Sequence, residues 1–227
     1  MTINIKTYNR TFGELYNNDN ITENGIYTYL CLTPFINSNC TYLPINVAKL
    51  NSILSDVANN KKQQDYIKTG LQELEQADLI KIISNKKNDY ELDLENMIEE
   101  YDKKNPYTVF PVDAFRQTLK DCKGKKTIFK FLSGYFYMLT HNEASEDGSE
   151  MWYFTATRES IAESCGIDVR SVDKYNDILT KNKIIYARKF HYSKQLPNVY
   201  VCGLYEDKDT IDSYCNDYLN NVKNGAC

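Results

Sequence analysis

Hydrophobic and polar positions follow the same order twice along this chain of 227 residues. In the second repeat, an apolar helical pattern over 125–140 leads into a polar acidic loop and a short β-like run at 151–155. Helical spacing returns after residue 157, and two β-branched and aromatic runs flank a turn at 193–198. The pattern predicts a helix, a strand, two more helices and a β-hairpin.

A tight turn separates the last two helices of the second repeat. Thr155 or Thr157 can cap the first of them, and Gly166 ends it in the conformation that a helix C-cap favours. Asp168 then caps the next helix. Four apolar residues share one face of that helix: Val172, Tyr175, Ile178 and Leu179. Two helices joined in this way predict a helix-turn-helix, and the hairpin that follows would be its wing.

The first repeat is less regular, but its parts come in the same order. An apolar run at 24–36 predicts its first helix. Residues 41–57 predict a short strand and a second helix, with Pro44 near the helix start, where proline is tolerated. The apolar face of the third helix contains Ile67, Leu71 and Leu74. A hairpin with a polar tip at 85–89 completes the repeat.

The two repeats can be aligned at the ends of their third helices. Placing Leu74 against Ile178 brings Ile80 onto Ile184. The end of the helix and the start of the hairpin then coincide in both repeats, as expected for a duplicated unit.

Acidic and Asn-rich stretches set the expected domain limits. We expect an N-terminal arm at 1–21, a first domain at 22–95, a linker at 96–106, a second domain at 107–205 and an acidic tail at 206–227. The second domain should open with a strand and a helix, and the tail should contain a short helix. The predicted fold class is mainly α with small β-hairpins, that is, α+β.

The turn and third helix of the second repeat, GIDVRSVDKYNDILTKNKII at 166–185, resemble those of winged-helix proteins. The duplicated arrangement is similar to the tandem winged-helix replication initiators of plasmids and phages, and to the N-terminal domain of DnaD-like primosome proteins. This resemblance covers about residues 22–205 and rests on the order of patterns. It implies two winged helix-turn-helix domains in tandem that bind double-stranded DNA.

The distribution of charge changes what the net charge implies. The formal charge of −4 argues against a nucleic-acid partner, because phosphates attract positive charge. Residues 178–205, however, include five basic residues and no acid, although 26% of the chain is charged. This wing is expected to contact phosphates, with a lysine-protected strand edge as the alternative. Another basic run at 120–130 either touches the DNA backbone or forms a solvated loop.

Candidate DNA-binding residues lie on the third helix and hairpin of each repeat. The first repeat offers Lys61, Lys62, Gln63, Gln64, Lys68, Lys86 and Lys87. The second offers Arg170, Ser171, Lys174, Asn176, Lys181, Arg188, Lys189 and Lys194. The helix residues are expected to stand off the apolar face, where Arg can read guanine and Asn or Gln adenine. The alternative for 61–64 is an ordinary exposed helical turn.

No motif for catalysis, metal binding or a cofactor occurs in the sequence. The seven cysteines are spread singly and only two histidines occur, which excludes paired zinc ligands. Phosphate-binding loops and nucleophile motifs are missing, and the acidic residues at 143–150 beside His141 do not fit a calcium loop. We expect reduced thiols and no enzymatic activity.

No run approaches the roughly 20 apolar residues that cross a bilayer, and the polar start lacks the apolar core of a secretion signal. A cytoplasmic protein without a membrane partner is therefore expected. The heavy use of Lys, Asn, Ile and Tyr is typical of an AT-rich bacterial host.

The leading functional hypothesis is a sequence-specific DNA-binding protein, a plasmid or phage replication initiator whose further partner is a helicase loader or a second chain. Its two domains would contact half-sites about 34–36 Å apart. A transcriptional repressor of a mobile element is the alternative in the same class. A winged-helix protein-interaction module without DNA binding is the alternative from another class.

Overall fold

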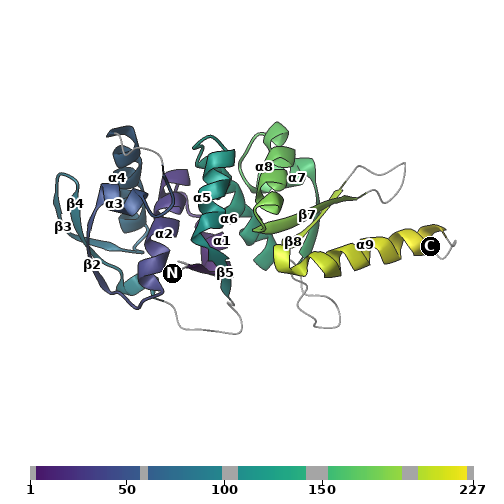
Figure 1. The fold of residues 1–227 in the computed structure, drawn as a ribbon, viewed down its shortest axis with the longest axis horizontal. Coiled ribbons are helices and arrows are strands. Elements are labelled where there is room, and N and C mark those ends of the chain that lie inside the picture. Colours follow the sequence, from purple (N-terminus) through teal and green to yellow (C-terminus); the bar gives the residue numbers. More distant parts are fainter. Residues whose placement is uncertain (1–3, 57–60, 99–106, 142–152, 191–198, 224–227) are drawn as a thin grey trace. The chain divides into compact units, whose positions relative to one another are not determined.

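The computed structural model describes residues 4–56, 61–98, 107–141, 153–190 and 199–223 (Figure 1). Helices dominate, and the described strands form three small antiparallel sheets, which confirms the α+β class. The chain divides into two compact units, Met1–Tyr137 (unit 1) and Met138–Cys227 (unit 2). Within the described residues, no helix is long and apolar enough to span a membrane.

Unit 1 contains the whole first repeat and the start of the second. The first repeat consists of β1 (Asn4–Tyr8), α1 (Asn9–Glu14), α2 (Glu23–Ile36), β2 (Tyr42–Asn46), α3 (Val47–Asn51), α4 (Lys61–Gln76), β3 (Lys81–Lys86), β4 (Asp89–Asp93) and the 3-10 turn η1 (Glu95–Met97). The second repeat begins with β5 (Tyr107–Pro111), α5 (Val112–Asp121) and α6 (Thr127–Thr140). The expected strand and helix after 106 are thus confirmed.

The hairpin strand β4 lies at the centre of the sheet β2–β4–β3. Leu92 pairs with Leu43 on one side and Ile82 on the other, and Leu92 and Leu43 are buried. A bulge between Ile82 and Ser84 leaves Ile83 half exposed. The sheet therefore has one apolar face toward the helices of the repeat, as its alternating sequence predicts.

Residues 1–21 do not form a separate arm. Strand β1 pairs antiparallel with β5, with Lys6 opposite Val109. The first strands of the two repeats therefore form one sheet. Helix α1 lies against α6, where a Cβ on Gly13 would come within 2.7 Å of the Tyr137 backbone. Because these contacts join the two repeats, the unit boundary falls within α6 and not at the expected linker 96–106.

Helices α2 and α4 pack closely against each other in unit 1. The backbone amides of Thr22 and Gly25 donate to the Glu73 carboxylate at 2.9 and 2.8 Å, and the Thr22 hydroxyl donates to it at 2.7 Å. Glu73 is buried, so these bonds replace its water. A Cβ on Gly70 would come within 2.1 Å of the Thr28 hydroxyl, which shows how closely the helices approach.

Unit 2 contains β6 (Tyr153–Thr157), α7 (Arg158–Ser164), α8 (Val169–Lys181), β7 (Ile185–Phe190), β8 (Val199–Leu204), the 3-10 turn η2 (Tyr205–Asp207) and α9 (Lys208–Lys223). Its sheet order, β6–β8–β7, matches that of the first repeat. Thr157 and Asp168 cap α7 and α8 by accepting from the amides of Ser160 and Arg170, as predicted. Gly166 has the expected positive φ, 57°.

The acidic tail is more structured than expected. Helix α9 begins at Lys208 and packs on the outer face of the β7–β8 hairpin (yellow in Figure 1). Ile211 and Cys215 are buried there against Phe190 and Val201. The turn at 193–198 and the acidic loop at 143–150 lie outside the described residues.

The structure shifts the alignment of the repeats by one residue. The amide of Leu79 donates to the Leu74 carbonyl, and the amide of Ile184 donates in the same way to Leu179, both at 3.0 Å. Asp78 and Lys183, one residue earlier in each repeat, both have φ near 57°. These helix ends have the pattern of a Schellman motif. Leu74 therefore corresponds to Leu179, and the alignment with Ile178 is wrong.

Gly70→Ala should destabilise the protein by about 2 kcal/mol or more, because the added methyl has no space between α4 and α2. Thr69→Ala, at the exposed neighbouring position, is the control and should change the free energy of unfolding by about 0.5 kcal/mol or less. Urea unfolding followed by circular dichroism measures both. Equal stability of the two variants would contradict the described packing.

Candidate nucleic-acid interface

The first turn of α4 is tied to the β3–β4 hairpin. The side-chain amide of Asn88, in the hairpin turn, donates to Gln64 Oε1 at 3.0 Å. Helical spacing places Lys61, Gln64 and Lys68 on one side of α4. Lys61 is exposed and Lys68 half-buried. The structure thus joins two segments of the predicted site, the helix start and the hairpin.

The hairpin and the start of α4 contribute further exposed lysines. Lys86 ends β3, Lys87 occupies the turn with a φ of 61°, and Lys62 lies in the first turn of α4; all three are exposed. Lys62 Nζ lies 5.8 Å from the centre of the Tyr66 ring. This surface is positive locally, although Asp65 and Asp89 are exposed on the same segments.

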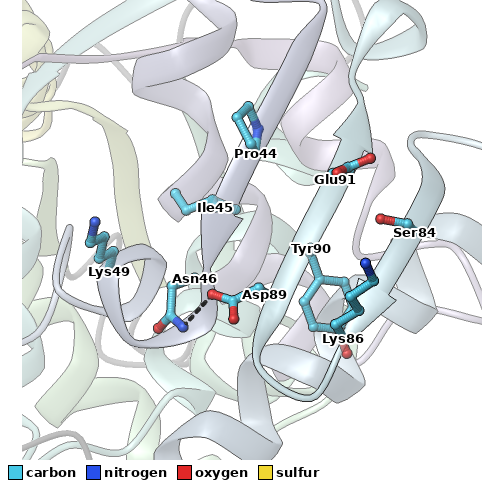
Figure 2. A pocket seen from close by; sticks show the side chains of 9 residues that line it. All are labelled: Pro44, Ile45, Asn46, Lys49, Ser84, Lys86, Asp89, Tyr90 and Glu91. Carbon is cyan, nitrogen blue, oxygen red and sulfur yellow. Dashed lines mark hydrogen bonds between the residues drawn. The ribbon is translucent and has the colours of Figure 1, made fainter.

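A cavity of about 290 Å³ lies beside this hairpin (Figure 2). Asn46 caps α3 through the Ala48 amide and donates to Asp89 Oδ1 at 2.7 Å. Lys49 and Lys86 line the cavity together with Asp89 and Glu91. Positive and negative groups are thus equal in number, so the cavity has no preference for an anion.

Gln63 faces the protein and not the solvent side of α4. Its Oε1 accepts from Lys126 Nζ at 3.2 Å. Lys126 is buried, with Nζ 3.9 Å from the centre of the Tyr66 ring and 4.7 Å from that of Tyr27. Burial lowers the pKa of Lys126 to about 8. The prediction that Gln63 is available for base readout is therefore wrong in this conformation.

The basic run at 120–130 does not form one surface. Lys120 forms an ion pair with Asp56 at 2.7 Å, and this contact lowers the pKa of Asp56. Lys123 and Lys125 are exposed, whereas Lys126 is buried. Residues 120–130 are therefore neither a continuous basic surface for phosphates nor a fully solvated loop.

In unit 2, the start of α8 combines an exposed arginine with its capping acid. The Arg170 guanidinium donates to both Asp168 oxygens, at 3.1 and 2.9 Å. Hydrogen bonding from Arg170 lowers the pKa of Asp168 to about 2. The Arg170 side chain is nevertheless 90% exposed, so an incoming phosphate or base can reach it. Ser171 is half-buried and Lys174 exposed on the same turn.

Asn176 does not stand off the apolar face of α8. Its side chain is buried, and neither its amide nitrogen nor its oxygen has a hydrogen-bond partner among the described residues. The corrected alignment explains the error, because Asn176 corresponds to Leu71 on the buried face of α4. Asn176 is therefore removed from the candidate readers of adenine.

The β7–β8 hairpin of unit 2, which the sequence predicts to be a wing, is less open than its sequence indicates. Arg188 Nη1 donates to Asp212 Oδ1 at 2.8 Å, and Nη2 donates to Asn216 Oδ1 at 3.0 Å. The Tyr186 hydroxyl also donates to Asp212, and burial together with this contact raises the pKa of Tyr186 to about 12. Arg188 thus binds α9, and the prediction of an open phosphate contact at this residue is wrong.

The other predicted residues of the second repeat differ in their surroundings. Lys181 is exposed at the end of α8, and Lys189 is exposed with Nζ 5.9 Å from the centre of the Tyr200 ring. Asp173 accepts from the Tyr200 hydroxyl and lies 3.7 Å from Arg158, so its charge is partly compensated. Lys194 lies outside the described residues.

The described residues offer no metal centre, and five of their six cysteines are buried. They contain no group of three or more His, Cys, Asp and Glu side chains that could hold a metal ion. The six described cysteines form no disulfide, and burial raises the pKa of Cys31 to about 12. A protonated, buried thiol is a poor nucleophile and a poor metal ligand.

Several contacts at this interface were not identified from the sequence: those of Glu73, Asn88, Lys126 and Asp212. For Asn88, the sequence predicts the polar hairpin tip at 85–89 in which it lies, but not its contact with Gln64. The other three bind residues at least 24 positions away, and no local pattern marks such contacts.

Comparison with known proteins gives no family, since neither the scan against protein-family models nor the search of curated proteins finds a match.

Arg188→Ala should lower the free energy of unfolding by about 1–2 kcal/mol, because Asp212 would lose its charged partner. Lys189→Ala removes the same charge from the neighbouring exposed position and should cost about 0.5 kcal/mol or less. Chemical denaturation of both variants measures the difference. No difference between them would show that Arg188 does not hold α9 on the β7–β8 hairpin.

The stability of the protein should depend on pH through Lys126. Below pH 8 the folded protein buries a charged lysine, and as the pH rises toward 10 it loses this proton before the unfolded chain does. Cys31 and Glu23 on α2 raise the pKa of Lys126 and so oppose the effect of burial, whereas Lys62 on α4 lowers it further. Relative to Lys126→Met, the wild type should gain unfolding free energy between pH 7 and 9.5. Parallel pH curves in urea titrations would contradict this assignment.

Proposed function

We propose that this protein binds double-stranded DNA through two winged helix-turn-helix domains in tandem. The observation that carries this proposal is the repeated order of helix, strand, two helices and hairpin, with the last hairpin strand at the centre of each sheet. In this arrangement α4 and α8 are the recognition helices, and the hairpins β3–β4 and β7–β8 are the wings.

The first repeat supplies the better-defined interface. The contact between Asn88 and Gln64 keeps the hairpin turn beside the start of α4. In this proposal, Lys61 and Lys62 bind phosphates as α4 enters the major groove, while Lys68, Lys86 and Lys87 bind the flanking backbone. Gln64 is the candidate for base readout on this helix.

The second repeat contributes a smaller set of contacts. Arg170 would exchange its intramolecular carboxylate for guanine or a phosphate, and Ser171 and Lys174 would position the helix. Lys181 and Lys189 remain candidates for backbone contacts. Once one domain binds DNA, the other is held near its own half-site, which raises the affinity of the whole chain. This gain compensates for the weak electrostatic attraction that a net charge of −4 implies.

Within this class we favour a replication initiator of a plasmid or phage in the cytoplasm of an AT-rich bacterium, with a helicase loader or a second chain as partner. The support for this role is the resemblance of the duplicated pattern at 22–205. A transcriptional repressor would use the same interface, and footprinting on origin and promoter fragments separates the two roles.

Lys61→Ala with Lys62→Ala should weaken duplex binding about tenfold or more near 0.1 M salt. It should also reduce the slope of log K against log salt by about 2, because each lost phosphate contact contributes about 0.9. Fluorescence anisotropy across a salt series measures both quantities.

The matched control is Lys6→Ala with Lys208→Ala, which removes two positive charges from β1 and α9. It should leave the salt slope within about 0.5 of the wild type. If the wild type binds no duplex of any sequence at low salt, DNA binding is excluded and a protein-interaction module becomes the better account.

A further inference from the structure

Lys126 connects the second repeat to the recognition helix of the first. It directly precedes α6, the first long helix of the second repeat, yet its amine contacts Gln63 and Tyr66 on α4. Both partners lie within the first two turns of α4. All these residues belong to unit 1, so the contact lies within one compact unit.

The surroundings of Lys126 are unusual for a lysine. Only 7% of the residue is exposed, although its neighbour Lys125 is exposed. Its Nζ lies near the rings of both Tyr66 and Tyr27, at 3.9 and 4.7 Å from the ring centres. The amine thus joins α4 to α2 as well. The two rings and the Gln63 amide oxygen offset part of the cost of removing this ammonium from water.

We propose that Lys126 is a positioning residue for DNA binding, which holds the first turns of α4 through Gln63 and Tyr66 without contacting DNA itself. This inference rests on the proposed function. It implies that the second repeat sets the orientation of the recognition helix in the first repeat. Lys61, Lys62 and Gln64 would then meet the major groove in one geometry, which reduces the entropy lost on binding.

The first measurement requires no DNA. Amide hydrogen exchange at residues 65–68 reports the opening of the first turns of α4, because these amides close its first hydrogen bonds. Lys126→Met should raise their exchange rate roughly tenfold, the equivalent of losing one or two cation–π contacts. Lys126→Arg keeps the charge, so its exchange rate at 65–68 should stay within about twofold of the wild type. Lys125→Met should leave this exchange rate unchanged.

The second measurement is duplex affinity across a salt series. Lys126→Met should bind about tenfold more weakly than the wild type with an unchanged salt slope, because no phosphate contact is lost. Lys126→Arg should restore the affinity. Gln63→Ala removes the acceptor from a half-buried position without removing the buried lysine, so it serves as the second variant if Lys126→Met does not fold. Gln63→Ala should also raise the exchange rate at 65–68 and weaken duplex binding, by a smaller factor than Lys126→Met does.

Two outcomes would overturn the proposal. An unchanged exchange rate at 65–68 in both Lys126→Met and Gln63→Ala would show that Lys126 does not hold α4. A salt slope reduced by about 1 in Lys126→Met would show a direct phosphate contact. If the wild type binds no DNA, the proposed function fails, and the exchange result alone then shows whether Lys126 positions α4.

Discussion

The buried Glu73 carboxylate is the contact that fixes α4, and the interface depends on the position of this helix. Glu73 accepts two backbone amides and one hydroxyl at the start of α2, where the helix dipole also favours a negative charge. Glycines at 25 and 70 let the two helices approach closely enough for these bonds. Because Asn88 in the β3–β4 hairpin donates to Gln64 on α4, the position of α4 also determines where this hairpin lies.

The sheet formed by β1 and β5 connects the second repeat to the elements that hold α4. Each strand begins one repeat, and their antiparallel pairing places residues 107–137 in unit 1. A two-stranded sheet is marginally stable alone, and α6 supports this one, because Phe136 packs against Phe110 in β5. Lys126 at the start of α6 then reaches α4. Helix α4 is therefore held by residues from both repeats.

Local signals predicted most elements of the fold, whereas long-range contacts decided which candidate residues are available. Asp168 and Thr157 act as caps because a short polar side chain can bind the next helical amides wherever the chain leads. The prediction for Asn176 was wrong because a polar residue type was taken to mark the exposed face, although residues 172, 176 and 179 have the spacing of one helical stripe. The charge pattern of 178–205 could not show that Asp212 on α9, beyond this segment, would bind Arg188.

The central claim is that duplex DNA contacts the start of α4 and the hairpin that Asn88 ties to it. Hydrogen exchange of the full chain with and without a duplex at low salt tests this claim most directly. We predict slower exchange at 61–68 and 85–89 on adding DNA, and little change on the acid-rich face of α9. Exchange unchanged throughout unit 1, or protection confined to α9, would contradict the account.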